Sequence, residues 1–271
     1  MSLDNLPLII EPEQLEEILD DPNLLIVDLC QPSVYQQLHV PGAIHVNPAE
    51  LVCGIPPATG KLPDKQQLAT LFSRIGFSKD KFVVAYDDEG GGWAGRFLWT
   101  LDVIGHSRYA YLNGGIHAWR NEGHSLQSGI NEPAPSDFEP TIDRSVAVDM
   151  DEVLAQIPDE SSVVWDARSA EEYHGTRQGA LRLGHIPGAV NLDWLETMDR
   201  NNNLRLKPLD QLRDKLENLG ITDDKTVITH CQTHHRSGLT YLIGKALGLQ
   251  IKAYDGSWSE WGNHPDTPIE K

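Results

Sequence analysis

Residues 226–238 read Thr226-Val227-Ile228-Thr229-His230-Cys231-Gln232-Thr233-His234-His235-Arg236-Ser237-Gly238. The β-branched run from Thr226 to Thr229 is typical of a buried strand, and residues 239–247 have the pattern of a helix. A strand that turns directly into a helix leaves the first backbone N–H groups of the helix unpaired, and the helix dipole adds positive potential there. Together with Arg236 and two histidines, these groups favour the thiolate of Cys231. Because the thiolate is the nucleophilic form, we predict that Cys231 is a catalytic nucleophile.

The sequence contains an internal duplication, in which three stretches of the first half recur in the same order in the second. Residues 25–44 correspond to residues 163–190, and both stretches contain a His-x-Pro-Gly-Ala turn. Residues 68–86 correspond to 212–230, and residues 112–119 correspond to 254–261. Each copy alternates short β runs with helical patterns. This alternation predicts an α/β fold, in which each copy forms a mainly parallel sheet flanked by helices.

The chain length of 271 residues leaves room for two domains of about 100–200 residues each. Residues 127–144 contain three prolines among polar residues and show no periodicity, which is typical of a linker. We therefore predict a first domain over residues 1–126, a linker over 127–144 and a second domain over 145–271.

Composition excludes several classes of protein. Lys and Arg number 22 against 40 Asp and Glu, a net charge of −18, which argues against nucleic-acid and anionic-membrane partners. No apolar run approaches the roughly 18 residues of a membrane span, and the first residues lack the features of a secretory signal. The three cysteines, an odd number without framework spacing, indicate a reducing compartment, so we expect a cytoplasmic protein.

The two copies differ at the nucleophile. Alignment on the strands places Asp87 opposite Cys231, followed by the acidic and glycine-rich stretch of residues 88–92. Alignment from the helix end puts Trp93 opposite Arg236, with Arg96 one turn further. We therefore predict that the first copy is catalytically inactive.

These features resemble the rhodanese superfamily of sulfurtransferases over essentially the whole chain. The resemblance is carried by Asp166 at a strand end, by residues 185–189, by the Cys231-to-Arg236 loop and by residues 256–261. It is close to bacterial tandem-domain members whose loop reads Cys-Gln-Thr-His-His-Arg. The resemblance implies that Cys231 takes a sulfane sulfur from a small anionic donor such as thiosulfate. The resulting persulfide would pass this sulfur to cyanide or another thiophilic acceptor, small molecule or protein, without a cofactor. The implied substrate-binding residues are Gln232, Thr233, His234, His235 and Arg236.

The identity of the donor stays open at this point. Thiosulfate-preferring members of the family usually carry basic residues directly after the cysteine, and mercaptopyruvate-preferring members carry Gly-Ser-Gly, whereas this chain has Gln232 and Thr233. A protein sulfur-relay role differs only in the acceptor. Some members also have a substrate-contacting arginine where this chain has Glu172, so that Arg168 or Arg177 are alternative basic groups.

Three other functions fit the sequence less well. A cysteine phosphatase has the signature His-Cys-x5-Arg, but only four residues separate Cys231 from Arg236, and this shorter loop suits one sulfur better than a phosphoryl group. A metal site made of His230, Cys231, His234 and His235 lacks the second ligand cluster of ordinary zinc sites, so we predict no metal. A binding module without activity is disfavoured for the second copy because it retains both cysteine and arginine.

Overall fold

The computed structural model describes residues 3–271, and residues 1–2 of the N-terminal segment discussed above lie outside the described residues. The chain divides into two compact units. Unit 1 holds the described residues up to Leu51 together with residues 63–143 and 199–206, and unit 2 holds residues 52–62, 144–198 and 207–271.

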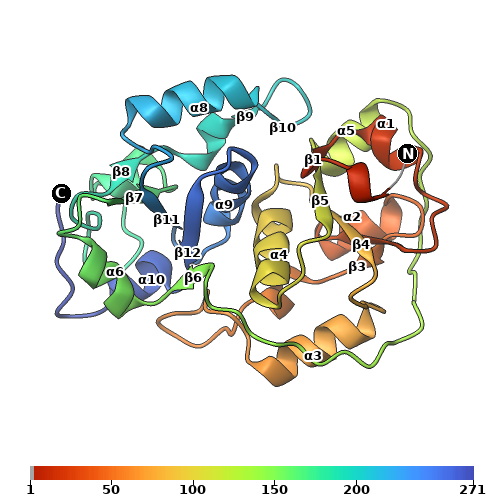
Figure 1. Cartoon of the computed structure of the whole chain (residues 1–271), viewed down its shortest axis with the longest axis horizontal. Helices are drawn as coiled ribbons and strands as arrows, with labels where there is room; N and C mark the ends of the chain where they lie inside the picture. The colour runs from red at the N-terminus through yellow and green to blue at the C-terminus, as the bar shows by residue number, and fades with distance from the viewer. Residues whose placement is uncertain (1–2) are drawn as a thin grey trace. The chain divides into compact units, whose positions relative to one another are not determined.

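Unit 1 is built on a five-stranded parallel sheet in the order β1-β5-β4-β2-β3 (Figure 1). Its strands are β1 Ile9–Ile10, β2 Leu24–Asp28, β3 Ile44–His45, β4 Phe82–Tyr86 and β5 Tyr109–Leu112. Its helices are α1 Pro12–Glu16, α2 Pro32–Gln37, α3 Lys65–Arg74, α4 Gly92–Val103 and α5 Gly115–Asn121, with the 3₁₀ turns η1 Leu3–Asn5 and η2 Pro48–Leu51.

Unit 2 repeats this arrangement, with a parallel sheet in the order β6-β12-β11-β7-β8. Its strands are β6 Ala147–Val148, β7 Ser162–Asp166, β8 Val190–Asn191, β11 Thr226–His230 and β12 Gln250–Tyr254. Its helices are α6 Met150–Gln156, α7 Ala170–Tyr173, α8 Leu209–Asn218, α9 Arg236–Ala246 and α10 Ser257–Trp261, with the 3₁₀ turn η3 Trp194–Thr197. The short strands β9 Met198–Asp199 and β10 Arg205–Leu206 pair only with each other. Because the two sheets match strand for strand, the predicted duplication and α/β fold are confirmed.

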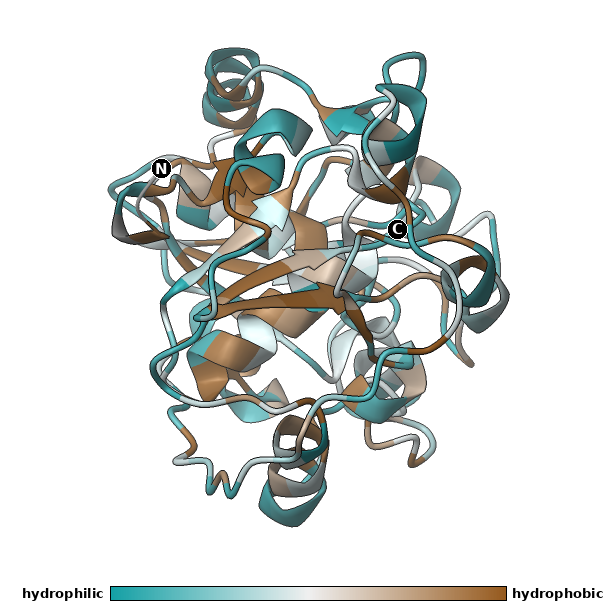
Figure 2. Ribbon diagram, turned by 90° about the vertical axis from the view of Figure 1, so that its right-hand side faces the viewer, coloured by the Kyte–Doolittle hydropathy of each residue, from teal (hydrophilic) through white to brown (hydrophobic). Residues whose placement is uncertain are grey.

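Apolar residues of the strands form the cores. In unit 2 the core includes Val164 of β7, Ile228 of β11 and Trp258 of α10, all at most 5% exposed. Figure 2 shows the strands mostly in the brown of hydrophobic residues, with teal concentrated on the surrounding helices and loops. Burial on both faces explains why the central strands are continuous apolar runs. Among the residues that the structure describes, no helix is both long and apolar enough to cross a bilayer.

The start of α9 and the predicted linker differ from the sequence-based expectation. The helix expected at 239–247 begins three residues earlier, at Arg236. The segment predicted as a linker has no helix, and its first residue, Gln127, forms an isolated bridge with His39. It packs onto unit 1, because Asn131 donates to the Ala43 carbonyl at 3.0 Å and Phe138 is buried.

Candidate active site

The topology of unit 2 brings two strand ends together at Cys231. The chain passes from β7 outward to β8 and later returns to place β11 on the other side of β7. Ligands of open α/β sheets bind beyond the carboxyl ends of the strands at such a reversal point. Cys231 directly follows β11, and Ala167 and Arg168 directly follow β7. The fold therefore places the predicted nucleophile where this class of protein binds ligands.

The backbone of the Cys231 loop, defined as residues 231–236, is held from the start of α10. The Cys231 N–H donates to the hydroxyl of Ser257 at 3.3 Å, and the Cys231 carbonyl accepts from the Trp258 N–H at 3.0 Å. The Gln232 carbonyl accepts from the Ser259 N–H at 2.9 Å. With these bonds both polar groups of the Cys231 backbone are used, so the backbone that carries the thiol is held in place.

A segment from the first half of the sequence also packs on the loop within unit 2. A side chain at Gly60 would collide with the backbone carbonyl of Thr233, so only glycine fits there. The neighbouring Leu62 N–H donates to the Asp255 carboxylate at 2.8 Å, and Lys61 pairs with Glu260. Residues 52–62 thus contribute to the walls of the site.

The environment of Cys231 favours its thiolate. The residue is fully buried, and burial alone would raise the thiol pKa. The positive charge of Arg236, hydrogen bonds from the Ser237 hydroxyl and backbone N–H, and the charge of His235 outweigh burial and lower the pKa to about 7. Arg236 and Ser237 are the first residues of α9, so the start of this helix faces the sulfur as predicted.

Arg236 lies in an ion pair that the sequence did not reveal. Its Nη1 and Nη2 atoms donate to the two oxygens of Glu172 at 2.6 and 2.9 Å. Burial would raise the pKa of Glu172, but the guanidinium holds it below its usual value. Glu172 is therefore the partner of Arg236, in place of the arginine that some family members carry at this position.

Arg168 and Arg177, the alternative basic groups considered for substrate contact, lie in other surroundings than Arg236. Arg168 is buried, donates from Nε to Asp166 at 2.9 Å and stacks on the Trp258 ring at 4.2 Å. Its charge is thus committed to Asp166, whose carboxylate also accepts from the Arg168 N–H at 3.0 Å and so stabilises the turn after β7. Arg177 is exposed on the loop that follows α7.

The remaining loop residues, all predicted to bind substrate, have distinct surroundings. Gln232 donates from Nε2 to the Gly179 carbonyl at 2.7 Å. His234 is fully buried with φ +55°, and its Nδ1 lies 2.7 Å from the Ser237 hydroxyl. His235 is partly exposed and packs edge-to-face on Trp194, with ring centroids 5.6 Å apart. Thr233 is partly exposed beside Gly60. The buried position of His234 suits a role in shaping the loop.

Unit 1 has the same loop frame around Asp87. The Asp87 carbonyl accepts from the Ile116 N–H at 3.2 Å, as the Cys231 carbonyl does from Trp258. One carboxylate oxygen of Asp87 accepts from the N–H groups of Glu89, Gly90 and Gly91 at 2.8–3.1 Å, and the other accepts from Ala94 at 2.9 Å. The cradle of N–H groups therefore exists in unit 1, but the side chain of Asp87 fills it. The helix there begins with Gly92, where α9 begins with Arg236.

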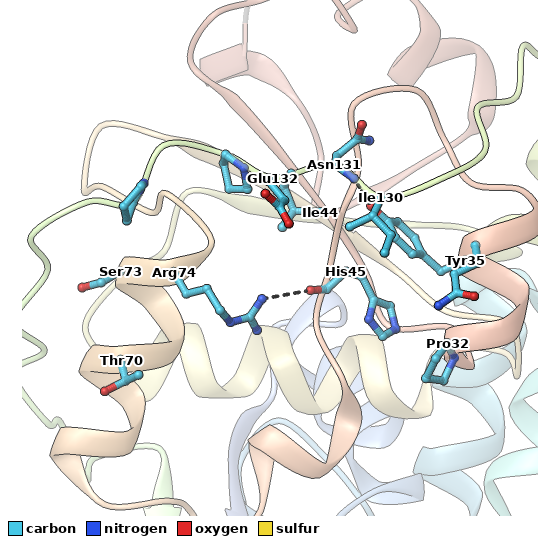
Figure 3. A pocket seen from close by; sticks show the side chains of 13 residues that line it. Pro32, Tyr35, Ile44, His45, Thr70, Ser73, Arg74, Ile130, Asn131 and Glu132 are labelled. Atoms are coloured by element: carbon cyan, nitrogen blue, oxygen red, sulfur yellow. Dashed lines mark hydrogen bonds between the residues drawn. The ribbon is translucent and has the colours of Figure 1, made fainter.

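A cavity of about 620 Å³ opens in unit 1 between α2, β3, α3 and residues 130–135 (Figure 3). Figure 3 shows Arg74 reaching toward the backbone carbonyl of His45, and the same guanidinium binds Glu50 at 2.9 Å. No cysteine is among the residues that line this cavity, and Cys231 belongs to unit 2. The cavity thus offers no thiolate for sulfur chemistry.

One group of possible metal ligands occurs among the described residues. Oxygen and nitrogen atoms of Glu13, Glu122 and His124 lie within 4.8 Å of one another in unit 1. Both carboxylates are exposed, and Glu122 already pairs with Arg205. The cluster contains none of the residues predicted to carry the chemistry.

Known proteins share both the sequence and the fold. The sequence-family model of the rhodanese-like domain matches residues 11–122 and again residues 149–264. The thiosulfate sulfurtransferase of Azotobacter vinelandii is 48% identical over 267 residues, 98% of each chain. The sulfur carrier protein TtuD of Thermus thermophilus is 32% identical and covers 97% of this chain and 96% of its own. The crystal structure of the 3-mercaptopyruvate sulfurtransferase SseA from Escherichia coli superimposes with a TM-score of 0.83 at 27% identity, covering 93% of this chain and 99% of that one. The chain therefore belongs to the rhodanese family and consists of two tandem rhodanese-like domains.

Proposed function

We propose that the protein is a thiosulfate sulfurtransferase in which Cys231 carries the transferred sulfur as a persulfide. The observation that carries this proposal is the buried Cys231 thiol at the start of α9, with a pKa lowered to about 7. Roughly half of such a thiol is ionised at neutral pH without any external base. Two relatives at 48% identity, from Azotobacter vinelandii and Pseudomonas aeruginosa, carry the name thiosulfate sulfurtransferase.

The reaction has two steps. The Cys231 thiolate attacks the outer sulfur of thiosulfate, the sulfur–sulfur bond of the donor breaks, and sulfite leaves with the bonding electrons. The enzyme now holds Cys–S–S⁻. Cyanide or another thiophile attacks the outer sulfur, forms thiocyanate or its counterpart, and returns the thiolate. Charge balances in both steps, so the cycle needs no redox cofactor and no metal.

The Cys231 loop supplies groups that stabilise the persulfide anion and the departing sulfite. The persulfide is an anion, so the Ser237 N–H and hydroxyl that face Cys231 stabilise the outer sulfur as an oxyanion hole stabilises oxygen. Arg236 and His235 add positive charge for the departing sulfite. Gln232, Thr233 and His234 complete the proposed substrate-binding loop, whose sequence resembles that of the bacterial type that reads Cys-Gln-Thr-His-His-Arg. A reducing compartment such as the cytoplasm suits the three unpaired cysteines.

Mercaptopyruvate as donor, or a protein as final acceptor, is the second candidate, because relatives named 3-mercaptopyruvate sulfurtransferase and sulfur carrier protein are 29% and 32% identical. Phosphatase activity is disfavoured by the four-residue spacing between Cys231 and Arg236.

The test is the intact mass of the protein after incubation with thiosulfate. Wild-type protein should gain one sulfur atom and lose it on addition of cyanide. Cys231→Ser should gain none, whereas Cys30→Ser and Cys53→Ser should behave as wild type. A sulfur adduct in the Cys231→Ser protein would refute the assignment, and incubation with mercaptopyruvate in parallel compares the two donors.

A further inference from the structure

The guanidinium of Arg236 reaches Glu172 with two parallel hydrogen bonds. The bonds from Nη1 and Nη2 measure 2.6 and 2.9 Å, and the two side chains are only 18% and 10% exposed. Paired bonds of this kind are among the stronger charge-assisted interactions in proteins. Arg236 is also the largest charge contribution that lowers the pKa of Cys231. One guanidinium therefore serves both a carboxylate and the nucleophile.

Glu172 is held in place independently of Arg236. It is the third residue of α7 and forms a capping box with Ser169: its carboxylate accepts from the Ser169 N–H at 3.2 Å, and its own N–H donates to the Ser169 hydroxyl at 3.4 Å. The carboxylate is thus fixed to the loop that follows β7, while Arg236 belongs to the helix that follows β11. The ion pair joins the two strand ends that flank the site.

The charge balance around Cys231 follows from this pair. Arg236 faces Glu172, and the buried Arg168 faces Asp166. Asp193, whose pKa is raised by burial and lowered in part by Arg236, adds another carboxyl group nearby. Glu172 already occupies the Nη1 and Nη2 atoms of Arg236, which would otherwise face an anionic donor as two parallel hydrogen-bond donors.

We propose that Glu172 is a specificity-determining residue, which engages the hydrogen-bond donors of Arg236 and thereby weakens the binding of doubly charged sulfur donors. This inference rests on the proposed sulfurtransferase function. The carboxylate partly neutralises the guanidinium, and the donor anion must compete with it for the same hydrogen-bond donors. When the negative charge of Glu172 is removed, the guanidinium of Arg236 can interact with the Cys231 thiolate and the donor anion.

Glu172→Gln is the informative variant. Glutamine retains the capping-box acceptor at this helical position and differs from glutamate by only one atom, so α7 remains capped. The matched control is Glu171→Gln, which changes the net charge equally at an exposed neighbour on the same helix. Two quantities are measured: KM and kcat with thiosulfate, and the pH midpoint of alkylation of Cys231.

In Glu172→Gln we expect KM for thiosulfate to fall roughly tenfold, because the donor anion can then form a charge-assisted hydrogen bond with Arg236 that Glu172 otherwise occupies. We also expect the alkylation midpoint to fall below that of wild type. Glu171→Gln should leave both quantities unchanged. An unchanged or increased KM in Glu172→Gln, or a midpoint that stays or rises, would overturn the inference.

The two readouts separate the two proposals. Alkylation of Cys231 needs no turnover, so the midpoint tests the role of Glu172 even in a protein that takes no sulfur from thiosulfate. A wild-type protein that forms no persulfide would refute the sulfurtransferase proposal. An active wild type with an unchanged Glu172→Gln variant would refute only the inference about Glu172.

Discussion

Replacement of Arg236 by alanine tests how the fold activates Cys231. The Arg236 charge is the largest of the contributions that lower the pKa of this buried thiol to about 7. The substitution also leaves the Glu172 carboxylate, whose side chain is only 10% exposed, without its ion-pair partner. Loss of a cation and exposure of an anion act in the same direction on the thiol. We therefore expect the pKa of Cys231 to rise to its ordinary value of 9.0 or above.

The size of the effect follows from that shift. With a pKa of about 7 roughly half of the thiol is ionised at pH 7, and with a pKa of 9.0 only about 1% is ionised. The rate of alkylation by iodoacetamide at pH 7 should thus fall roughly 50-fold, less any change in intrinsic nucleophilicity. Sulfur transfer should fall by about 10²–10³, as when an oxyanion-hole donor is lost.

The assay is the rate of iodoacetamide alkylation against pH, in a protein where Cys30→Ser and Cys53→Ser leave Cys231 as the only thiol. Arg236→Lys keeps the charge but loses the planar fork, and its midpoint should lie between those of wild type and Arg236→Ala. Arg236→Ala combined with Glu172→Ala removes the stranded carboxylate, and should bring the midpoint partly back. A midpoint near 7 in Arg236→Ala would show that the helix N-terminus alone activates the sulfur.

Three further outcomes are expected. The folded-state pKa of Cys231 lies below its unfolded value, so ionisation of this thiol stabilises the folded protein above pH 9, and this stabilisation is lost as pH falls through about 7. The difference in unfolding free energy between wild type and Cys231→Ser should therefore be larger at pH 10 than at pH 6 by about 3 kcal/mol, as measured by urea denaturation. Ser257→Gly removes the acceptor of the Cys231 N–H, but glycine suits the φ of +52° at this position, so kcat should fall while the melting temperature stays unchanged. Ser257→Ala should lower both kcat and the melting temperature. An equal kcat in wild type and Ser257→Gly would contradict a positioning role for Ser257. Asp87→Cys in a Cys231→Ser background should give a thiol with an alkylation midpoint well above 7, because Glu89 lies nearby and the helix begins with Gly92. A reactive, low-pKa thiol at position 87 would refute this reasoning.

The sequence predicted the frame of the molecule well. The central strands β4 and β11 are short runs made mostly of apolar and β-branched residues, and their shortness and β-branched content favour a buried strand over a helix. The start of α9 escaped prediction because Arg236, Ser237 and Gly238 carry no apolar periodicity. The first turn of this helix faces the site instead of the core, so its residues suit contact with the sulfur and do not show the apolar pattern of a core-facing helix.

The partners of the site were harder to predict. Cys231 and its loop stand in one contiguous stretch, but Glu172 lies 64 positions from Arg236 and Ser257 lies 26 positions from Cys231. Such contacts depend on which strand ends the topology joins. The sequence offered one partial signal for Ser257, its correspondence to Gly115 in the first copy. The structure adds that both residues have a left-handed backbone, with φ +52° and φ +54°, so a serine in a conformation that favours glycine points to a role for its side chain.

The two copies within this chain separate the contribution of the fold from that of the side chains. Both have the strand–turn–helix frame, and in both the backbone after the central strand is bound by the start of the last helix. In unit 1 the cradle of N–H groups closes on the Asp87 carboxylate, which remains buried, and burial with the charge of Glu89 raises its pKa to about 6. The frame by itself therefore makes an anion site. Unit 2 differs by a shorter side chain at that point and by a guanidinium at the helix start. We therefore propose that activity in this fold requires a cradle that its own residue does not fill, and a cation that holds the nucleophile ionised.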